Sequence, residues 1–173
     1  MVKYFITLLF FIFFSCVPYY KNEYGIYEPK NPNYSLKDKK DFIFPENLDT
    51  INLYKYYGYY DKNLIIKNEN KINWSIYNKF CSKGRVYGFG TELLVEKNLN
   101  PNFASKKYYY YDKKNNIIKI ENFVIADGGH YIILKYKLSK NGDTLTTVSN
   151  GKSEDVFIKE KIPEGWKRYK VNW

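Results

Sequence analysis

The sequence predicts an all-β domain: an antiparallel meander of about eight short strands, closed into a barrel or, alternatively, stacked as a β-sandwich. One observation is the alternation of apolar and polar residues along successive short runs from about Leu48 onward. Another is that turn sequences such as "DKKNN", "ADGG" and "SKNGD" separate these runs. Turns this short leave no room for the helical crossovers that parallel strands need, so the strands are expected to be antiparallel.

The alternation predicts strands near 53–60, 73–80, 85–90, 107–112, 117–124, 130–138, 143–149 and 154–160. In the run 130–138, Ile132, Leu134 and Tyr136 share one face and lysines occupy the other, as expected for a half-buried strand. Residues 91–100 predict either a helix of one or two turns or a continuation of the preceding strand. A closed barrel hides every strand edge, which favours it over the sandwich.

The chain begins with a segment typical of a signal peptide, residues 1–15. Lys3 precedes an apolar run over 4–14. A spanning helix needs about twenty residues to cross the hydrocarbon core, so the run is too short to span and has the length of a signal-peptide core.

The sequence Phe13-Phe14-Ser15-Cys16 resembles the lipobox of bacterial lipoproteins cleaved by signal peptidase II. The resemblance implies cleavage before Cys16 and attachment of diacylglycerol and an acyl chain such as palmitate to that residue. The membrane is then the first partner, and the protein is expected on the cell membrane or outer membrane, facing the periplasm or the cell surface. Cys81 remains as the one free thiol, so no intramolecular disulfide is expected.

Residues 16–47 are expected to be the lipidated cysteine and a flexible tether, and residues 48–173 the β-domain. Four of the chain's six prolines lie in residues 16–47, and no hydrophobic period persists there.

A second resemblance is to lipocalin-like lipoproteins of bacterial envelopes. It rests on "YYGYY" at 56–60, "FCSKGRVYGFG" at 80–90 and "LSKNGDTLTTVSNGKSEDVFIK" at 138–159. It implies a barrel with a cavity for a small apolar ligand.

The formal net charge of +10 favours anionic partners. Nucleic acid is nevertheless not expected, because the only arginines are Arg85 and Arg168 and the lysines form no run longer than a pair. The abundance of Lys, Asn, Ile, Tyr and Phe also fits an AT-rich genome, which weakens arguments from their number.

The sequence offers little for catalysis. His130, the only histidine, follows Asp127 in "ADGGHY". The two could pair as a general base, but a hairpin turn followed by a strand is the favoured interpretation. No phosphate-binding or dinucleotide motif occurs, and one histidine without a free cysteine pair cannot form a zinc site. We therefore expect no enzyme, no cofactor and no metal.

Tyrosine-rich runs at 54–62 and 106–114 could stack on sugars or form an aromatic pocket, although they equally suit ordinary strands. The candidate ligand or partner contacts are Tyr57, Tyr59, Trp74, Tyr87, Tyr109, Tyr111 and His130. The expected function is non-enzymatic binding of a small apolar ligand or an envelope component. The alternative is an interaction subunit of an envelope complex without a ligand cavity, and a hydrolase ranks last. The oligomeric state is left open.

Overall fold

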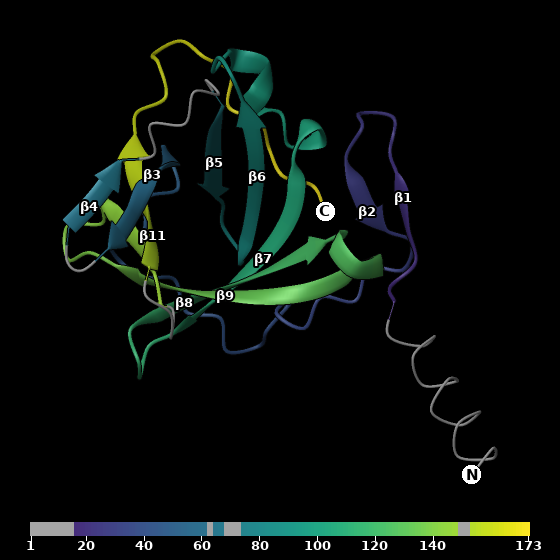
Figure 1. Cartoon of the computed structure of the whole chain (residues 1–173), viewed down its shortest axis with the longest axis horizontal. Helices are drawn as coiled ribbons and strands as arrows, with labels where there is room; N and C mark the ends of the chain where they lie inside the picture. The colour runs from purple at the N-terminus through teal and green to yellow at the C-terminus, as the bar shows by residue number, and fades with distance from the viewer. Residues whose placement is uncertain (1–15, 62–63, 68–73, 149–152) are drawn as a thin grey trace.

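The structure is a computed structural model that describes residues 16–61, 64–67, 74–148 and 153–173 (Figure 1). The predicted signal peptide lies outside the described residues, as does the connection at 150–152 between the predicted strands 143–149 and 154–160.

Eight antiparallel strands form a closed barrel. They are β3 (Leu53–Asp61), β5 (Ser75–Phe80), β6 (Arg85–Thr91), β7 (Ser105–Asp112), β8 (Ile117–Val124), β9 (His130–Leu138), β10 (Thr144–Thr147) and β11 (Ser153–Glu160). Each strand pairs with its neighbour in the chain, and β11 pairs with β3 from Ser153 opposite Asp61 to Glu160 opposite Leu53. This last ladder confirms the predicted barrel and rules out the sandwich. The register of this ladder steps between Val156 and Phe157, because Tyr57 is an extra residue on β3, and such a bulge bends β3.

The structure adds elements that the alternation did not predict. The strands β1 (Tyr19–Lys21) and β2 (Tyr27–Pro29) form a hairpin beside the barrel, and β4 (Leu64–Lys67) pairs back on β3 (Figure 1). Three single-turn 3-10 helices follow: η1 (Glu96–Leu99), η2 (Pro101–Phe103) and η3 (Ala126–Gly128). The helical alternative for residues 91–100 is therefore correct in its shortest form, because β6 ends at Thr91 and η1 is one turn long.

The barrel has two unlike ends. At the closed end the strands are joined by the turns 81–84, 113–116 and 139–143, and residues 42–48 lie across them. The first turn uses the left-handed conformations of Lys83 and Gly84 (φ +58° and +70°), which bring the chain back sharply. At the open end lie η1, η2 and η3, so longer connections surround this mouth.

Three apolar clusters organise the molecule. The interior cluster draws side chains from all eight barrel strands: Tyr54, Phe80, Val86, Tyr109, Ile118, Ile120, Tyr136, Leu145 and Phe157, with Leu48 from the closed end. A second cluster lies outside β3, β5 and β6, beneath η1, η2 and the C-terminal segment. A third lies outside β7, β8 and β9, beneath the N-terminal segment.

The expectation of a flexible tether at 16–47 is wrong for most of that segment. The buried backbone N–H of Leu36 donates to Glu121 Oε2 at 2.7 Å, and the ring of Tyr34 lies 4.8 Å from the rings of both Tyr108 and Tyr131. Phe42 packs edge-on against Tyr109 at 5.3 Å. Isolated apolar side chains in an irregular, proline-rich segment bury one at a time, which leaves no periodic pattern to read. The folded unit therefore begins well before residue 48.

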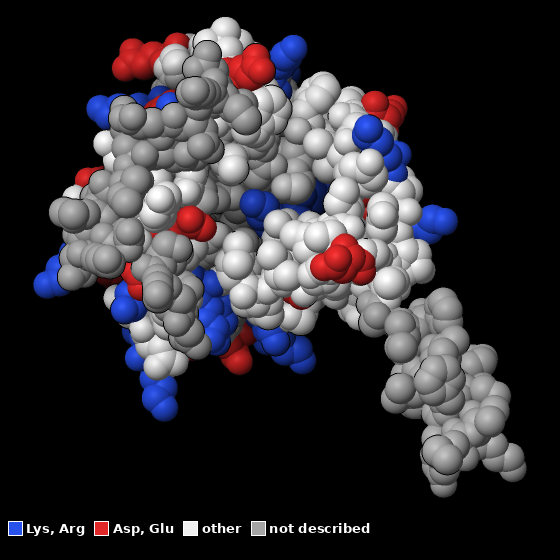
Figure 2. Space-filling model, in the orientation of Figure 1, with Lys and Arg blue, Asp and Glu red and all other residues white. Residues whose placement is uncertain are grey.

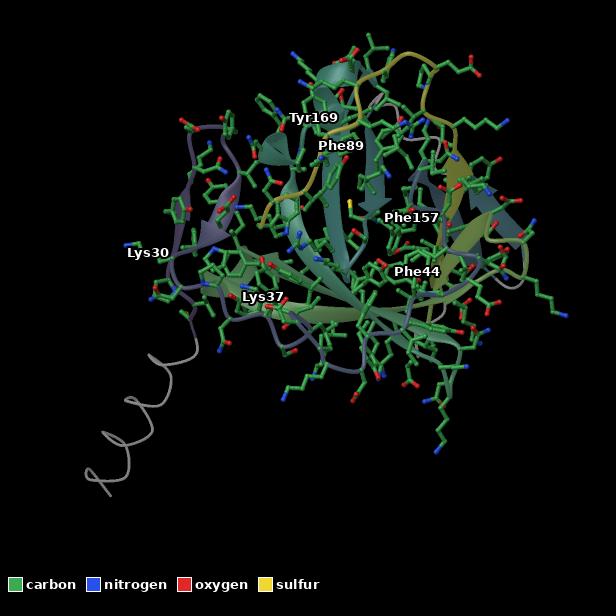
Figure 3. The ribbon with its side chains drawn as sticks, turned by 180° about the vertical axis from the view of Figure 1, so that it is seen from behind. Lys30, Lys37, Phe44, Phe89, Phe157 and Tyr169 are labelled. Atoms are coloured by element: carbon green, nitrogen blue, oxygen red, sulfur yellow. The ribbon has the colours of Figure 1, made fainter. Side chains whose placement is uncertain are left out.

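The C-terminal segment is a second covering strap, over residues 161–173. The backbone N–H of Ile162 donates to Asn52 Oδ1 at 3.3 Å, and Trp166, Tyr169 and Val171 pack on the second cluster. Figure 3 shows Tyr169 near Phe89 of β6, on the side of the barrel that this strap covers.

Candidate ligand-binding site

The interior of the barrel is tightly packed only in its closed half. The rings of Tyr54 and Phe80 are 5.4 Å apart and those of Phe80 and Tyr109 are 5.2 Å apart, all in edge-to-face contacts. The hydroxyl of Tyr54 donates to Gly142 O at 2.7 Å and accepts from the N–H of Asp49 at 3.2 Å. Burial raises the pKa of this hydroxyl to about 12. Leu48 and Phe42 cover the stack from outside the end, so the closed half leaves no space for a ligand.

In the open half, side chains on the inward face are reached by solvent. Leu134 lies directly opposite Ile120, whose side chain is in the interior core, yet Leu134 is 39% exposed. Ile76 lies opposite Gly90, on the same face of β5 as buried Phe80, and is 45% exposed. Figure 2 shows this side of the molecule hollowed above β8 and β9, with basic side-chain atoms in the hollow. The interior is therefore open above its aromatic floor.

A charged side chain, Lys107, points into this interior. The register places Lys107 opposite Val86 on β6 and Asn122 on β8, and alternation puts it on the same face as Tyr109 and Tyr111. Its ammonium donates to Asn78 Oδ1 at 2.8 Å. Burial lowers the pKa of Lys107 to about 8, which still leaves most of the population protonated at pH 7.

Two neighbours shape the space around this ammonium. A side chain at Gly88 would collide with the Nζ of Lys107, so the absence of one on β6 makes room for the cation. Asn122 Oδ1 is buried and has no hydrogen-bond partner among the described residues. Buried polar atoms are almost always satisfied in folded proteins, so an unpaired acceptor here points to a missing donor such as a water or a ligand. A cation and an open acceptor thus lie among apolar walls, an arrangement that can hold one polar group of a small molecule.

The residues predicted as contacts do not form one site. Tyr109 and Tyr111 lie in the barrel interior, where their hydroxyls donate to Cys81 O at 3.2 Å and Asn116 Oδ1 at 2.9 Å. Tyr87 is buried outside the barrel, in the second cluster, and donates to Leu99 O at 2.9 Å.

The remaining predicted contacts are spread over β3, the open rim and the start of β9. Trp74 is exposed beside Gly90, at the open rim, and Tyr57 is exposed on β3. Tyr59 is half-buried on β3, opposite Asp155 of β11. His130 begins β9, and its Nδ1 lies 3.1 Å from Ala126 O in η3, which matches the turn-and-strand interpretation.

Lys107 and Asn122 were missed by the sequence reasoning. A clue existed in "KKYYYYDKK", because strict alternation places Lys107 with the inward tyrosines rather than with the outward ones. Asn78 and Asn122 carried no such clue, since their approach to Lys107 depends on the register of four strands.

Cys16 is exposed and lies at the open end of the barrel. The backbone N–H of Val17 donates to Gly129 O at 2.9 Å, and Cys16 Sγ is 3.9 Å from Asp127 O. Within the described ranges, no three His, Cys, Asp or Glu side chains form a group suited to a metal ion. Among the same residues, no helix has the length and apolarity to cross a membrane.

Comparison with known protein families, with curated proteins and with solved structures finds no match to this chain.

Proposed function

We propose that this chain is a lipid-anchored, non-enzymatic binding protein of the cell envelope. Its lipocalin-like barrel takes a small, largely apolar molecule with one anionic or hydrogen-bonding group into the open half. The observation that carries the proposal is the inward ammonium of Lys107, which lies near Asn78 and Asn122 in an interior whose other walls are largely apolar and whose open half is reached by solvent. Among the described residues, Asn122 Oδ1 has no hydrogen-bond partner.

The chemistry of the interior supports a ligand with a polar head. Burying the hydrocarbon of a ligand against apolar walls contributes a favourable free energy of about 25 cal/mol per Å² of apolar surface. A buried ammonium is costly unless it is paired, and a carboxylate or phosphate oxygen would pair it. A donor such as a ligand hydroxyl would satisfy Asn122 Oδ1.

Binding without chemistry is favoured by the groups that meet there. An ammonium and two carboxamides orient a ligand, but they contain no nucleophile with an adjacent base. Because Lys107 is mostly protonated at neutral pH, it acts as an ion-pairing partner.

The ligand proposal predicts a charge-dependent affinity that a fluorescent probe can measure. Dansyl-labelled undecanoic acid, added to the full chain in non-ionic detergent, should bind at pH 7 and weaken at least tenfold in Lys107→Met. The methyl ester of the probe should show no such difference, because it has no charge to pair. Lys137→Met removes an exposed lysine from β9 and should leave both affinities unchanged.

Equal binding of acid and ester, or equal loss in both lysine variants, would contradict a role for Lys107. Native mass spectrometry of the full chain from its own host should then identify the natural occupant. A bound small molecule that is lost in Lys107→Met supports the proposal, whereas a stoichiometric protein partner with an empty barrel supports the interaction-subunit alternative. The whole chain is needed because residues 17–48 cover the barrel.

The anchor is supported by the lipobox and by the exposure of Cys16 beside the mouth. An acylated Cys16 would hold the open end close to the bilayer, where Trp74, Phe103 and Ile125 are exposed apolar side chains. Two or three acyl chains anchor a protein stably, since each buried CH₂ contributes about 0.8 kcal/mol.

Cys16→Ser is expected to abolish labelling by a clickable palmitate analogue and to leave the precursor uncleaved. Globomycin treatment should likewise leave the precursor of the parent chain uncleaved. Cys81→Ser is the matched control and should label normally, and persistent labelling of Cys16→Ser would rule out the lipoprotein assignment.

A further inference from the structure

A second cavity lies on the outside of the barrel, between its closed end and the C-terminal strap. It has a volume of about 750 Å³, and its walls come from residues 50–51, 81–83 and 168–172, together with Lys79, Arg85, Tyr87, Leu99 and Ile162. This volume is within the range of small-molecule sites, roughly 300 to 1,000 Å³. It is separate from the barrel interior, because Tyr87 and Leu99 belong to the outer cluster.

The charge of this cleft is one-sided. No Asp or Glu lines it. Five basic side chains do: Lys79, Lys83, Arg85, Arg168 and Lys170. They include both arginines of the chain. In the part of the chain that the structure describes, the ion pairs within 4.0 Å involve other lysines, so none of these five cations forms one.

The two guanidinium groups are held in place across the cleft. Arg85 Nη1 donates to Val171 O at 3.0 Å, and Arg168 Nη1 donates to Ile51 O at 2.8 Å. Each of these bonds joins the barrel side of the cleft to the strap side, so both arginines are positioned before any ligand arrives. A guanidinium carries five N–H donors, and the remaining ones suit the oxygens of a phosphate.

The floor of the cleft is apolar. Tyr87 and Leu99 are almost completely buried, and the hydroxyl of Tyr87 donates a hydrogen bond to the carbonyl of Leu99. Ile162 adds a buried aliphatic side chain from the strap. An apolar floor under a basic rim favours an anion that carries an organic group over a bare ion.

We propose that this outer cleft binds a small phosphate-bearing molecule, with its phosphate oxygens at Arg85 and Arg168 and its organic part against Tyr87 and Ile162. The site goes beyond the function proposed for the barrel interior and does not depend on it. The phosphate could belong to a soluble metabolite or to a phospholipid head group, since both present the same oxygens.

Calorimetric titration of the full chain with inorganic pyrophosphate tests the site. Pyrophosphate should bind the parent, and Lys83→Gln combined with Arg168→Gln should weaken binding at least tenfold. The control Lys135→Gln with Lys137→Gln removes the same charge from β9, across the barrel from β5, and should change affinity less than twofold. Equal weakening in both pairs would mean that only net charge matters and would overturn the proposal.

Cys81 provides a local readout, because it lines the cleft. Burial raises the pKa of its thiol, so alkylation is slow and sensitive to access. Saturating pyrophosphate should slow the alkylation of Cys81 by iodoacetamide, as measured by peptide mapping. An unchanged rate at Cys81 under saturation would place the anion elsewhere and overturn the proposal.

Short-chain phosphatidic acid, below its micelle concentration, separates the two sources of phosphate. Tighter binding of this lipid than of pyrophosphate, lost in the Lys83 and Arg168 double variant, assigns a lipid head group. Tighter binding of pyrophosphate assigns a soluble ligand. No binding of either probe overturns the proposal.

Discussion

At the scale of single residues, Lys107 is the least conventional feature of the molecule. A lysine inside a barrel loses much of its hydration, and one amide oxygen at 2.8 Å replaces only part of it. The lowered pKa is the measurable sign of that cost. The proposed ligand would supply the missing partner of this ammonium. Asn122 Oδ1, which has no hydrogen-bond partner among the described residues, supports the same proposal.

The lowered pKa predicts a stability that rises with pH. Between the folded value of about 8 and the unfolded value of 10.5, the unfolded chain keeps a proton that the folded chain has released. Raising the pH through this window therefore favours folding, by about 2 to 3 kcal/mol between pH 8 and pH 10. Urea denaturation at a series of pH values should show this rise in the parent chain and not in Lys107→Met.

Tyrosines set the upper limit of that window. Burial raises the folded pKa of Tyr54 to about 12 and also raises those of Tyr109 and Tyr136, while unfolded tyrosines ionise near 10. Stability should thus fall again above pH 10. Lys137→Met is the control for the rise in unfolding free energy between pH 8 and pH 10 and should keep it. A rise that also persists in Lys107→Met would show that another group is responsible.

At the scale of elements, the N-terminal segment behaves as a strap rather than a tether. It is held by Glu121, which is buried outside β8 and accepts the backbone N–H of Leu36. Tyr34 fills the gap between Tyr108 and Tyr131, and Lys106 joins β7 to Glu28 of β2 through an ion pair at 3.0 Å. The strap covers apolar rings that would otherwise face water.

Glu121→Ala should detach this strap, because the buried N–H of Leu36 loses its acceptor. The expected loss is about 1 to 3 kcal/mol of unfolding free energy. Hydrogen exchange measured by mass spectrometry should accelerate over residues 33–37 while the barrel strands stay protected. Glu121→Gln keeps an acceptor oxygen and should lose less, and Glu164→Ala removes an exposed carboxylate as the control. Unchanged exchange at 33–37 in Glu121→Ala would contradict the strap.

At the scale of the whole molecule, the two ends of the closed barrel differ in their role. The closed end holds the aromatic stack and the covering residues Phe42 and Leu48, which provide stability. The open end holds the inward cation and lies beside Cys16. Because the interior and the outer cleft share β5 and β6 as a wall but face opposite sides of it, one small barrel can present two chemically different cavities.

The eight barrel strands were predictable because alternation is a local property of the chain. In β9, for example, Leu134 and Tyr136 against Lys135 and Lys137 are enough to mark a strand and its two faces. Turn residues such as Gly142, with φ +74°, marked the ends in the same local way. The short hairpin β1–β2 had no such pattern in its three-residue strands and was missed.

The sequence by itself therefore determined the eight barrel strands, their antiparallel order and the chemical character of its first sixteen residues. Only the tertiary structure decided that β11 meets β3, that residues 17–48 lie on the barrel, and that Lys107, Asn78 and Asn122 share the interior. It also decided that Arg85 and Arg168, 83 positions apart in the sequence, line one cleft. The physical reason is that strand period and turn geometry arise between near neighbours, whereas closure, coverage and both cavities arise from contacts between distant parts of the chain.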